Sequence, residues 1–282
     1  MPLSPSSSAQ SAREAVATRL KEVQKDADLT GHGLALRLGW SESKVSRIAN
    51  ARTPPSDADI RAWCDACGVP EQAADIVAAN RQAGEMYVEW KRLHRSGMKH
   101  AQESVLPVIK GSRHIGVYCS NVTPGMLQRH AYAHALMSTI TEFQQTPDDV
   151  DDAVESRLKR SRYLFEGTRT FAFVLEETVL RYRVGDRAAM EDQLQYLLEV
   201  IGAARVSFGI IPFGAQRKMW PLEAFSLFDD RQVNAELLSA AVTITAPGEI
   251  AAYLKAFKIL SSMAVYGAQA KALIRAALSS LE

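Results

Sequence analysis

The stretch that most restricts the possible folds covers residues 30–49, because it reads as two short helices joined at Gly39. Thr30 and Ser41 stand at the start of the two helices, where a hydroxyl side chain can accept a hydrogen bond from the helix backbone. The residues at helical spacing on the inner face are Leu34, Ala35, Leu38, Val45 and Ile48. This pattern predicts a helix-turn-helix whose apolar face packs on further helices.

The second helix of the pair, over residues 41–49, should point short polar side chains and cations away from that core. Serine and lysine can reach base edges in a major groove, while arginine and the helix dipole can hold phosphate. The predicted DNA-contacting residues are Thr30, His32, Ser41, Glu42, Ser43, Lys44, Ser46, Arg47, Arg52 and Thr53. The alternative interpretation of the same pattern is an ordinary solvent-facing helix hairpin.

This region resembles the Xre and phage-repressor class of helix-turn-helix regulators, over residues 12 to about 80. The resemblance is carried by Leu34, Ala35, Leu38, Gly39, residues 43–48, Arg52, Thr53 and Pro54. It implies double-stranded DNA as the partner. The family has Glu, Asn and Gly after the isoleucine, where this chain has Ala49, Asn50 and Ala51. The missing glycine affects the left-handed turn with which such a helix ends.

The net charge of the chain provides no bulk attraction to nucleic acid. Residues 1–100 hold 14 Lys and Arg against 12 Asp and Glu, and the remainder holds 19 against 20. Non-specific affinity for phosphate normally comes from an excess of positive charge. Any DNA binding must therefore come from a local cluster on one face.

Composition and periodicity divide the chain into four parts. Residues 1–11 are rich in Ser, Pro, Ala and Gln, which predicts a flexible tail. Residues 12–84 keep a helical period with short breaks and are predicted to form the helix-turn-helix domain. Residues 85–108 stay helix-compatible and are interpreted as a helical connector, with Gly97 as a candidate interruption. Residues 109–282 are predicted to form an α+β domain for dimerisation and sensing.

The α+β prediction depends on a change of pattern after residue 108. Short apolar runs at residues 115–118, 171–175, 206–212 and 224–228 predict strands. Helices are expected from Thr123 to about residue 140 with Pro124 in the first turn, from Pro147 onward, over residues 190–201, and as a pair over residues 247–281. The expected fold class is a mainly α helix-turn-helix bundle followed by an α+β domain.

The second half also resembles the C-terminal domain of a two-domain Xre-type family common in actinomycetes, whose biochemical role is unassigned. The resemblance spans about residues 110–275 and is carried by residues 122–128, Tyr132, Ala133, residues 157–162, Glu176, Glu177, Leu180, Arg181, Gln193, Leu194, Leu197, Leu198 and residues 210–212. It implies a small partner protein as one possible binding partner. The chain departs from the family at Thr123 and at Ser161, which follows Arg160 where the family has Gln.

Aromatic, Met and cationic residues near predicted strand ends and loops are the candidates for ligand or partner binding. They are Tyr118, Met126, Tyr132, Phe213, Arg217, Lys218 and Trp220. The loop over residues 213–221 is the stronger part of this prediction, because exposed loops often bind. The competing interpretation is that the aromatic residues are core. Arg157, Arg160 and Arg162 are interpreted as a solvated helix face, with an anion site as the alternative.

Metal and enzymatic interpretations are weaker. Cys64 and Cys67 share an apolar stripe with a tryptophan, which favours buried structural thiols over zinc or redox chemistry. His130 and His134 have metal-compatible spacing but no HExxH pattern, so no metal is predicted. Adjacent Glu176 and Glu177 should point to opposite faces of a strand. No cofactor and no catalytic residue is therefore predicted, and the chain is not expected to be an enzyme.

These observations together predict a sequence-specific, DNA-binding transcriptional regulator that reads a palindromic operator as a homodimer. Its C-terminal domain would dimerise and sense a small-molecule effector or a small partner protein. The opening residues lack the features of a signal peptide and no apolar span is long enough for a membrane, so a cytoplasmic, nucleoid-associated protein is expected. The alternative is a protein- or ligand-binding adaptor with a weakened helix-turn-helix, suggested by Ala49 and Ala51.

Overall fold

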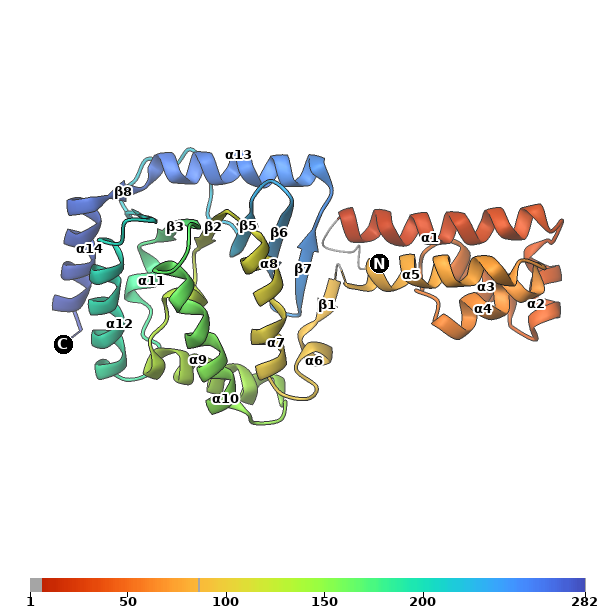
Figure 1. Cartoon of the computed structure of the whole chain (residues 1–282), viewed down its shortest axis with the longest axis horizontal. Coiled ribbons are helices and arrows are strands. Elements are labelled where there is room, and N and C mark those ends of the chain that lie inside the picture. Colours follow the sequence, from red (N-terminus) through yellow and green to blue (C-terminus); the bar gives the residue numbers. More distant parts are fainter. Residues whose placement is uncertain (1–6, 86, 282) are drawn as a thin grey trace. The chain divides into compact units, whose positions relative to one another are not determined.

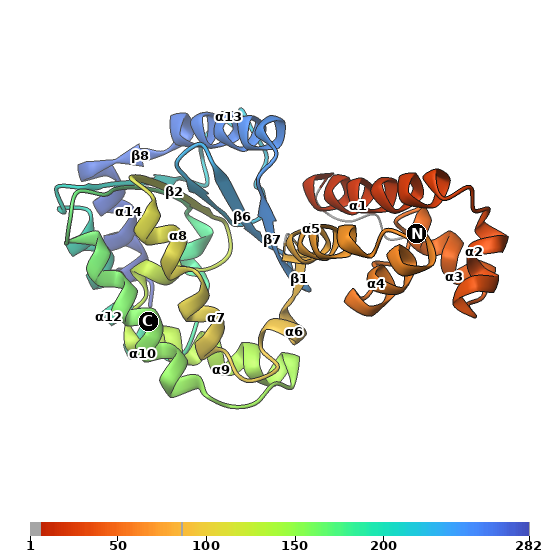
Figure 2. The same ribbon diagram turned by 45° about the vertical axis from the view of Figure 1, so that its right-hand side comes forward.

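The computed structural model describes residues 7–85 and 87–281, which divide into two compact units. The first extends to residue 88 and includes residues 242–244, and the second contains residues 89–241 and the chain from residue 245 onward. Helices make up the first unit, and helices surround a sheet in the second (Figure 1; Figure 2). The predicted fold class, a helical N-terminal part followed by an α+β part, is confirmed.

Five α-helices build the described part of the first unit around one apolar core. They are α1 (Ser7–Asp26), α2 (Gly31–Leu38), α3 (Glu42–Ala49), α4 (Asp57–Ala66) and α5 (Ala73–Glu85), with a 3-10 turn at Pro70–Gln72 before α5. Leu20, Leu34 and Trp63 are fully enclosed in this core. The indole Nε1 of Trp63 donates to the Leu20 carbonyl at 3.0 Å, so the one polar atom of the ring is satisfied.

The predicted N-caps are present. Thr30 Oγ1 accepts from the Gly33 amide at 3.0 Å and Ser41 Oγ accepts from the Lys44 amide at 3.2 Å. Ser56 forms a capping box at the start of α4. These caps fix where α2, α3 and α4 begin.

The first four helices all end in the same way. Each is followed by one residue in the left-handed region, and these residues are Asp28, Gly39, Ala51 and Gly68. After α3 the Arg52 amide donates to the Arg47 carbonyl and the Ala51 amide to the Ile48 carbonyl, which is the Schellman pattern. Ala51 adopts a φ of 53°, so alanine makes the turn for which the pattern usually uses glycine.

At the edges of this unit the structure differs in detail from two sequence predictions. The predicted flexible tail covers residues 1–11, of which residues 1–6 lie outside the described part. Helix α1 already begins at Ser7, and within it the Gln10 side chain donates to the Glu14 carboxylate at 2.8 Å. The predicted connector over residues 85–108 is helical only in short pieces. It contains the strand β1 (Tyr87–Glu89) and the short helices α6 (Trp90–Leu93), α7 (Lys99–Ser104) and α8 (Leu106–Gly111).

Long-range contacts explain why the connector segment is broken. The Trp90 backbone amide donates to the Ser239 carbonyl at 3.0 Å, and its indole donates to the Leu237 carbonyl at 2.7 Å. Gly97 has a φ of 102°, and the Asp149 carboxylate lies where a Cβ would stand. That carboxylate accepts from the first amides of α7, so tertiary structure overrides the local helical preference here.

A mixed sheet organises the second unit. Its strands β2 (His114–Cys119), β3 (Thr170–Glu176), β4 (Val206–Ile211), β5 (Phe225–Phe228), β6 (Gln232–Glu236) and β8 (Val265–Tyr266) follow the order β6-β5-β2-β3-β4-β8. The pairs β2/β3 and β3/β4 are parallel, and the flanking pairs are antiparallel. The strands β1 and β7 (Ala240–Ile244) each contain residues assigned to both units, because the boundaries along the chain fall after residue 88 and after residue 241. All four strand predictions fall within β2, β3, β4 and β5 or overlap them.

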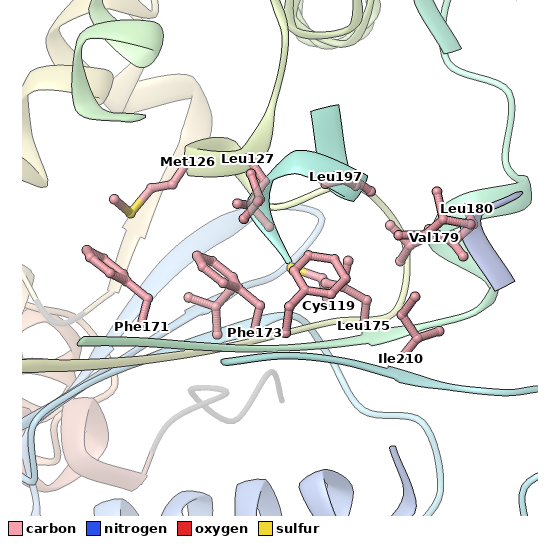
Figure 3. Packing of buried hydrophobic residues seen from close by; sticks show 14 of the residues in the cluster. Cys119, Met126, Leu127, Phe171, Phe173, Leu175, Val179, Leu180, Leu197 and Ile210 are labelled. Carbon is pink, nitrogen blue, oxygen red and sulfur yellow. The ribbon is translucent and has the colours of Figure 1, made fainter. Parts of the chain in front are cut away.

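Helices cover both faces of the sheet. The remaining helices of the second unit are α9 (His130–Gln144), α10 (Val150–Ser161), α11 (Thr178–Arg181), α12 (Arg187–Val200), α13 (Pro247–Met263) and α14 (Gly267–Ser279). Phe171, Phe173 and Leu175 of β3 point toward Leu127 and Leu197 on one face (Figure 3). Helix α13 packs on the opposite face (Figure 1). None of the described helices is both long and apolar enough to cross a bilayer.

The helix predicted from Thr123 begins later than expected. Gly125–Leu127 form a single 3-10 turn, and α9 starts at His130. Thr123 is buried, its amide donates to the Tyr132 hydroxyl at 3.1 Å, and its carbonyl accepts from the Gln128 side chain at 2.6 Å. These tertiary bonds hold the segment out of the helix that the Thr-Pro-Gly signal predicts.

Candidate nucleic-acid interface

The apolar residues of α3 fix which of its side chains face solvent. Val45 and Ile48 are each 2% exposed and pack in the core of the first unit. Nine of the ten predicted DNA-contacting residues are exposed, and they are Thr30, His32, Ser41, Glu42, Ser43, Ser46, Arg47, Arg52 and Thr53. Lys44 is the half-buried exception.

An open cleft is lined by some of these predicted residues and by residues at the end of α1. Of the predicted residues, Thr30, His32, Glu42, Ser43 and Ser46 line it. The cleft lies where the N-terminus of α2 and the outer face of α3 meet α1. Ser41, Lys44, Arg47, Arg52 and Thr53 do not line this cleft.

Three residues of α1 were missed by sequence reasoning. Lys21, Gln24 and Lys25 line the same cleft as the first turn of α3. The Lys21 Nζ donates to Asn50 Oδ1 at 3.1 Å, which ties α1 to the end of α3. The available signal was the pair of lysines at i and i+4, since such residues share one helix face.

Two bonds position the polar residues of the interface before any ligand arrives. His32 Nδ1 lies 2.7 Å from Glu42 Oε1, joining α2 to the first turn of α3. The Arg47 guanidinium donates to the Ser43 hydroxyl one turn earlier on α3. Both contacts are exposed, so they are worth little in stability and can be exchanged for contacts to a ligand.

Lys44 has partners inside its own unit. Its Nζ lies 2.5 Å from Asp59 Oδ1 and 3.7 Å from the centre of the Trp40 ring. Partial burial by itself raises the pKa of Asp59, but the hydrogen bonds from Lys44 and Ser56 outweigh it and the pKa lies below its usual range. Contact of Lys44 with a base therefore stays a prediction, and it requires this ion pair to open.

The C-terminal candidates separate into buried and exposed residues. Tyr118, Met126 and Tyr132 are at most 9% exposed, and the last two belong to the main core. The competing interpretation, core aromatic residues, is therefore the correct one for the two tyrosines. Phe213 and Trp220 are 61% and 68% exposed, and Lys218 is also exposed.

Arg217 anchors the loop that carries these exposed residues. Its guanidinium meets the buried Glu176 carboxylate in a two-pronged contact of 2.7 and 2.5 Å. The Tyr118 hydroxyl donates to the same carboxylate at 2.9 Å, and burial followed by the Glu176 charge raises the pKa of this tyrosine. The neighbouring Glu177 bonds instead to Arg181 and to the Phe213 amide, so the adjacent carboxylates have separate partners.

The cysteines considered for zinc or redox chemistry are buried, and the histidines considered for metal binding have partners within the fold. Cys64 and Cys67 are buried thiols in the core of the first unit, and burial raises the pKa of both. His134 Nε2 lies 3.4 Å from Asp151, whereas His114 bonds to Thr170 on the sheet. Within residues 7–85 and 87–281, no group of three or more His, Cys, Asp or Glu side chains is arranged to hold a metal.

The interpretation of the arginine cluster as a solvated helix face is wrong for two of its members. Arg162 is exposed and lies 4.0 Å from Glu166. Arg157 is half-buried and Arg160 is 7% exposed, because both occupy the side of α10 that also carries buried Ala153. Burial lowers the pKa of Arg157 to about 10 and that of Arg160 to about 9.

Comparison with known proteins finds two domain families in the chain. A family described as "Helix-turn-helix domain" matches residues 15–75, and one described as "Domain of unknown function (DUF5753)" matches residues 106–276. None of the curated proteins compared with the sequence matches it.

Among solved structures, an archaeal chromatin protein, TrmBL2, is similar at 11% identity over 78% of this chain and 71% of its own, with a TM-score of 0.33. The TrmBL2 structure shows a novel mode of DNA binding by that protein. A TM-score of this size carries no weight for the present fold or function. The second domain match covers more than half of the chain, and the chain therefore belongs to the family defined by this domain of unknown function, with a helix-turn-helix domain before it in the sequence.

Proposed function

We propose that the protein is a sequence-specific transcriptional regulator of the Xre type that binds palindromic double-stranded DNA through α3. The observation that carries the proposal is the shared cleft, in which the outer face of α3 meets the N-terminus of α2 and the lysines of α1. A helix N-terminus and nearby cations are the groups that hold phosphate, while short polar side chains on the second helix can reach bases.

The roles of individual residues follow from their positions. Ser43 and Ser46 are exposed on the outer side of α3, so they are the proposed base-reading residues. Lys21, Lys25 and Arg47 are exposed cations around them, and we assign them to phosphates. Because the unit as a whole carries almost no excess charge, loss of one of these cations removes a large share of its phosphate affinity.

A single reading helix contacts only a few base pairs, so useful specificity requires two copies. Two half-sites about one helical turn apart, roughly 34 Å, fit a pair of such helices. We assign dimerisation, and the sensing of a small molecule or a small partner protein, to the α+β unit. This proposal contains no catalytic step and places the protein in the cytoplasm, at the nucleoid when bound to DNA.

The test starts from genome-wide mapping of the DNA bound by the full chain, followed by anisotropy titrations on a mapped duplex and on a scrambled one. Lys21→Ala should weaken binding to both duplexes, whereas Ser43→Ala should cost about 1 to 3 kcal/mol mainly on the mapped one. Arg19→Ala is the matched control, because Arg19 is an exposed cation on the same helix that bonds to Gln72, away from the cleft. Equal losses for Lys21→Ala and Arg19→Ala would refute the assigned face.

The second candidate function is a protein- or ligand-binding adaptor whose helix-turn-helix no longer reads DNA. The observations that favour it are Ala49 and Ala51 at the end of α3, with Ala51 in a left-handed conformation. This candidate predicts no preference for any mapped duplex and an unchanged affinity in the Ser43→Ala variant.

A further inference from the structure

Arg160 is buried and the neighbouring Arg157 is half-buried in the α+β unit, and within the described part of the chain neither has a carboxylate beside it. The exposed fraction of Arg160 is 7%. Among the described residues, no Asp or Glu oxygen lies within 4.0 Å of either guanidinium. Charged groups inside proteins are ordinarily paired, so two neighbouring cations without a counter-charge need an explanation.

The acceptors that the two arginines do have are neutral amide oxygens. Gln102 Oε1 accepts from Arg157 Nε at 3.0 Å and from Arg160 Nη2 at 2.6 Å. Gln128 Oε1 accepts from Arg157 Nη1 at 2.7 Å. Gln128 is itself held by the Thr123 carbonyl, so both glutamines orient donors and neither supplies negative charge.

One buried guanidinium donor of the pair has no acceptor among the described residues. A guanidinium carries five N–H donors, of which Arg160 uses one in the bonds described above and Arg157 uses two. The Nε of Arg160 is buried and has no hydrogen-bond partner within the described part of the chain. An enclosed N–H without an acceptor is costly, and it marks a place where an acceptor belongs.

The pKa shifts of the two arginines show that burial outweighs the charge of the Glu236 carboxylate. Burial lowers the pKa of Arg160, and the charge of Arg157 lowers it further, while Glu236 acts in the opposite direction. Glu236 is exposed at the end of β6 and forms no ion pair with either arginine. Both arginines stay protonated at neutral pH, since their pKa values remain at about 10 and about 9.

We propose that Arg157 and Arg160 form a binding site for an oxyanion, the carboxylate or phosphate group of a small ligand. Such a group brings a full negative charge and several acceptor oxygens, and the planar guanidinium fork matches it. Gln102 and Gln128 hold the two forks in place. The site lies entirely in the second unit and does not depend on the DNA-binding proposal.

The first experiment measures thermal unfolding of the full chain at pH 7 in sodium phosphate, sodium acetate and sodium chloride of equal ionic strength. We expect a saturable rise in Tm with phosphate or acetate and none with chloride. At one hundred times Kd, the ligand raises the folding equilibrium constant about 100-fold. Which of the two salts acts distinguishes a phosphate from a carboxylate ligand.

Two variants separate a site from a general salt effect. Arg160→Met removes one fork at similar volume and should abolish the rise. Arg162→Met removes an exposed cation two residues further along the chain and should leave the rise unchanged. If Arg160→Met does not fold, the wild type is titrated instead by NMR, where the Arg160 Nε–H signal should shift saturably with the active anion. No saturable change with either anion, or the same rise in both variants, would overturn the proposal.

Discussion

Replacing Ala51 with glycine should stabilise the first unit, although the substitution lies beside the proposed recognition helix. Ala51 has a φ of 53° in the Schellman turn after α3. A residue with a Cβ loses about 1–2 kcal/mol in this conformation, and glycine avoids that loss. Glycine in turn gives up about 0.5–1 kcal/mol through the greater freedom of the unfolded chain. The net expectation is a gain of about 0.5–1 kcal/mol in the free energy of unfolding.

The reverse substitution one helix earlier is the matched control. Gly39 occupies the same position after α2 with a φ of 64°, and an added Cβ there would meet nothing within 4 Å. Gly39→Ala should therefore lower stability by a similar amount, about 0.5–1 kcal/mol, through backbone conformation alone.

Three buried cysteines allow each unit to be followed separately. Urea titrations with pulsed thiol labelling and mass spectrometry report the first unit through Cys64 and Cys67 and the second through Cys119. Ala51→Gly should move the midpoint of the first two to higher urea and leave that of Cys119 in place. An unchanged or lower midpoint for Cys64, together with the expected fall in Gly39→Ala, would refute the reasoning about the α3 turn.

Three further predictions are tested by unfolding titrations; the acid profile and the cysteine variant, which lacks the thiols of the first unit, are followed by circular dichroism instead of thiol labelling. The pKa of Asp59 is lower in the folded than in the unfolded state, so Asp59 adds to the free energy of unfolding above about pH 4, its unfolded pKa, and this stabilisation is lost as the pH falls through the folded pKa. Asp59→Asn should therefore make the stability of the first unit less dependent on pH in the acid range, and an unchanged pH dependence would contradict this. Replacing Cys64 and Cys67 with alanine should lower the free energy of unfolding by about 1 kcal/mol for each cysteine, because each change leaves a gap in the core, and it should leave DNA affinity unchanged. Zinc that is bound in equimolar amount by the wild type and lost in this variant would contradict the prediction. Arg217→Ala should lower the stability of the second unit by about 2 kcal/mol, because it leaves the Glu176 carboxylate buried without its cation. Glu176→Gln should cost less, and the reverse order would contradict this ranking.

The helical unit follows from sequence because its signals are local. Thr30 and Ser41 cap the helices that their positions predict, and the apolar spacing around Gly39 gives the correct buried face. The conformation of Ala51 could not be predicted in the same way, since alanine carries no turn signal of its own. The Schellman bonds there depend on the rest of the helix end, which forces the turn on whatever residue occupies it.

The errors in the second unit come from long-range structure. Gly97 is an expected interruption of the connector, but its partner Asp149 lies 52 positions away in the sequence and carries no local signal for this contact. Arg157 and Arg160 carry the composition of a solvated helix face, and only the packing of α10 shows that they point inward. Tyr118 looked like a binding residue because it ends a strand, but its hydroxyl is used by Glu176 inside the fold.

Hydroxyl-radical footprinting of a genome-mapped duplex with the full chain tests the central claim most directly, because it reports both the reading helix and its pairing. The account predicts two protected patches on one side of the duplex, with centres about one helical turn, roughly 34 Å, apart. Both patches should disappear when Ser43, Ser46 and Arg47 are replaced together by alanine. A single patch, or protection that persists in this triple variant, would contradict the claim that two copies of α3 read the DNA.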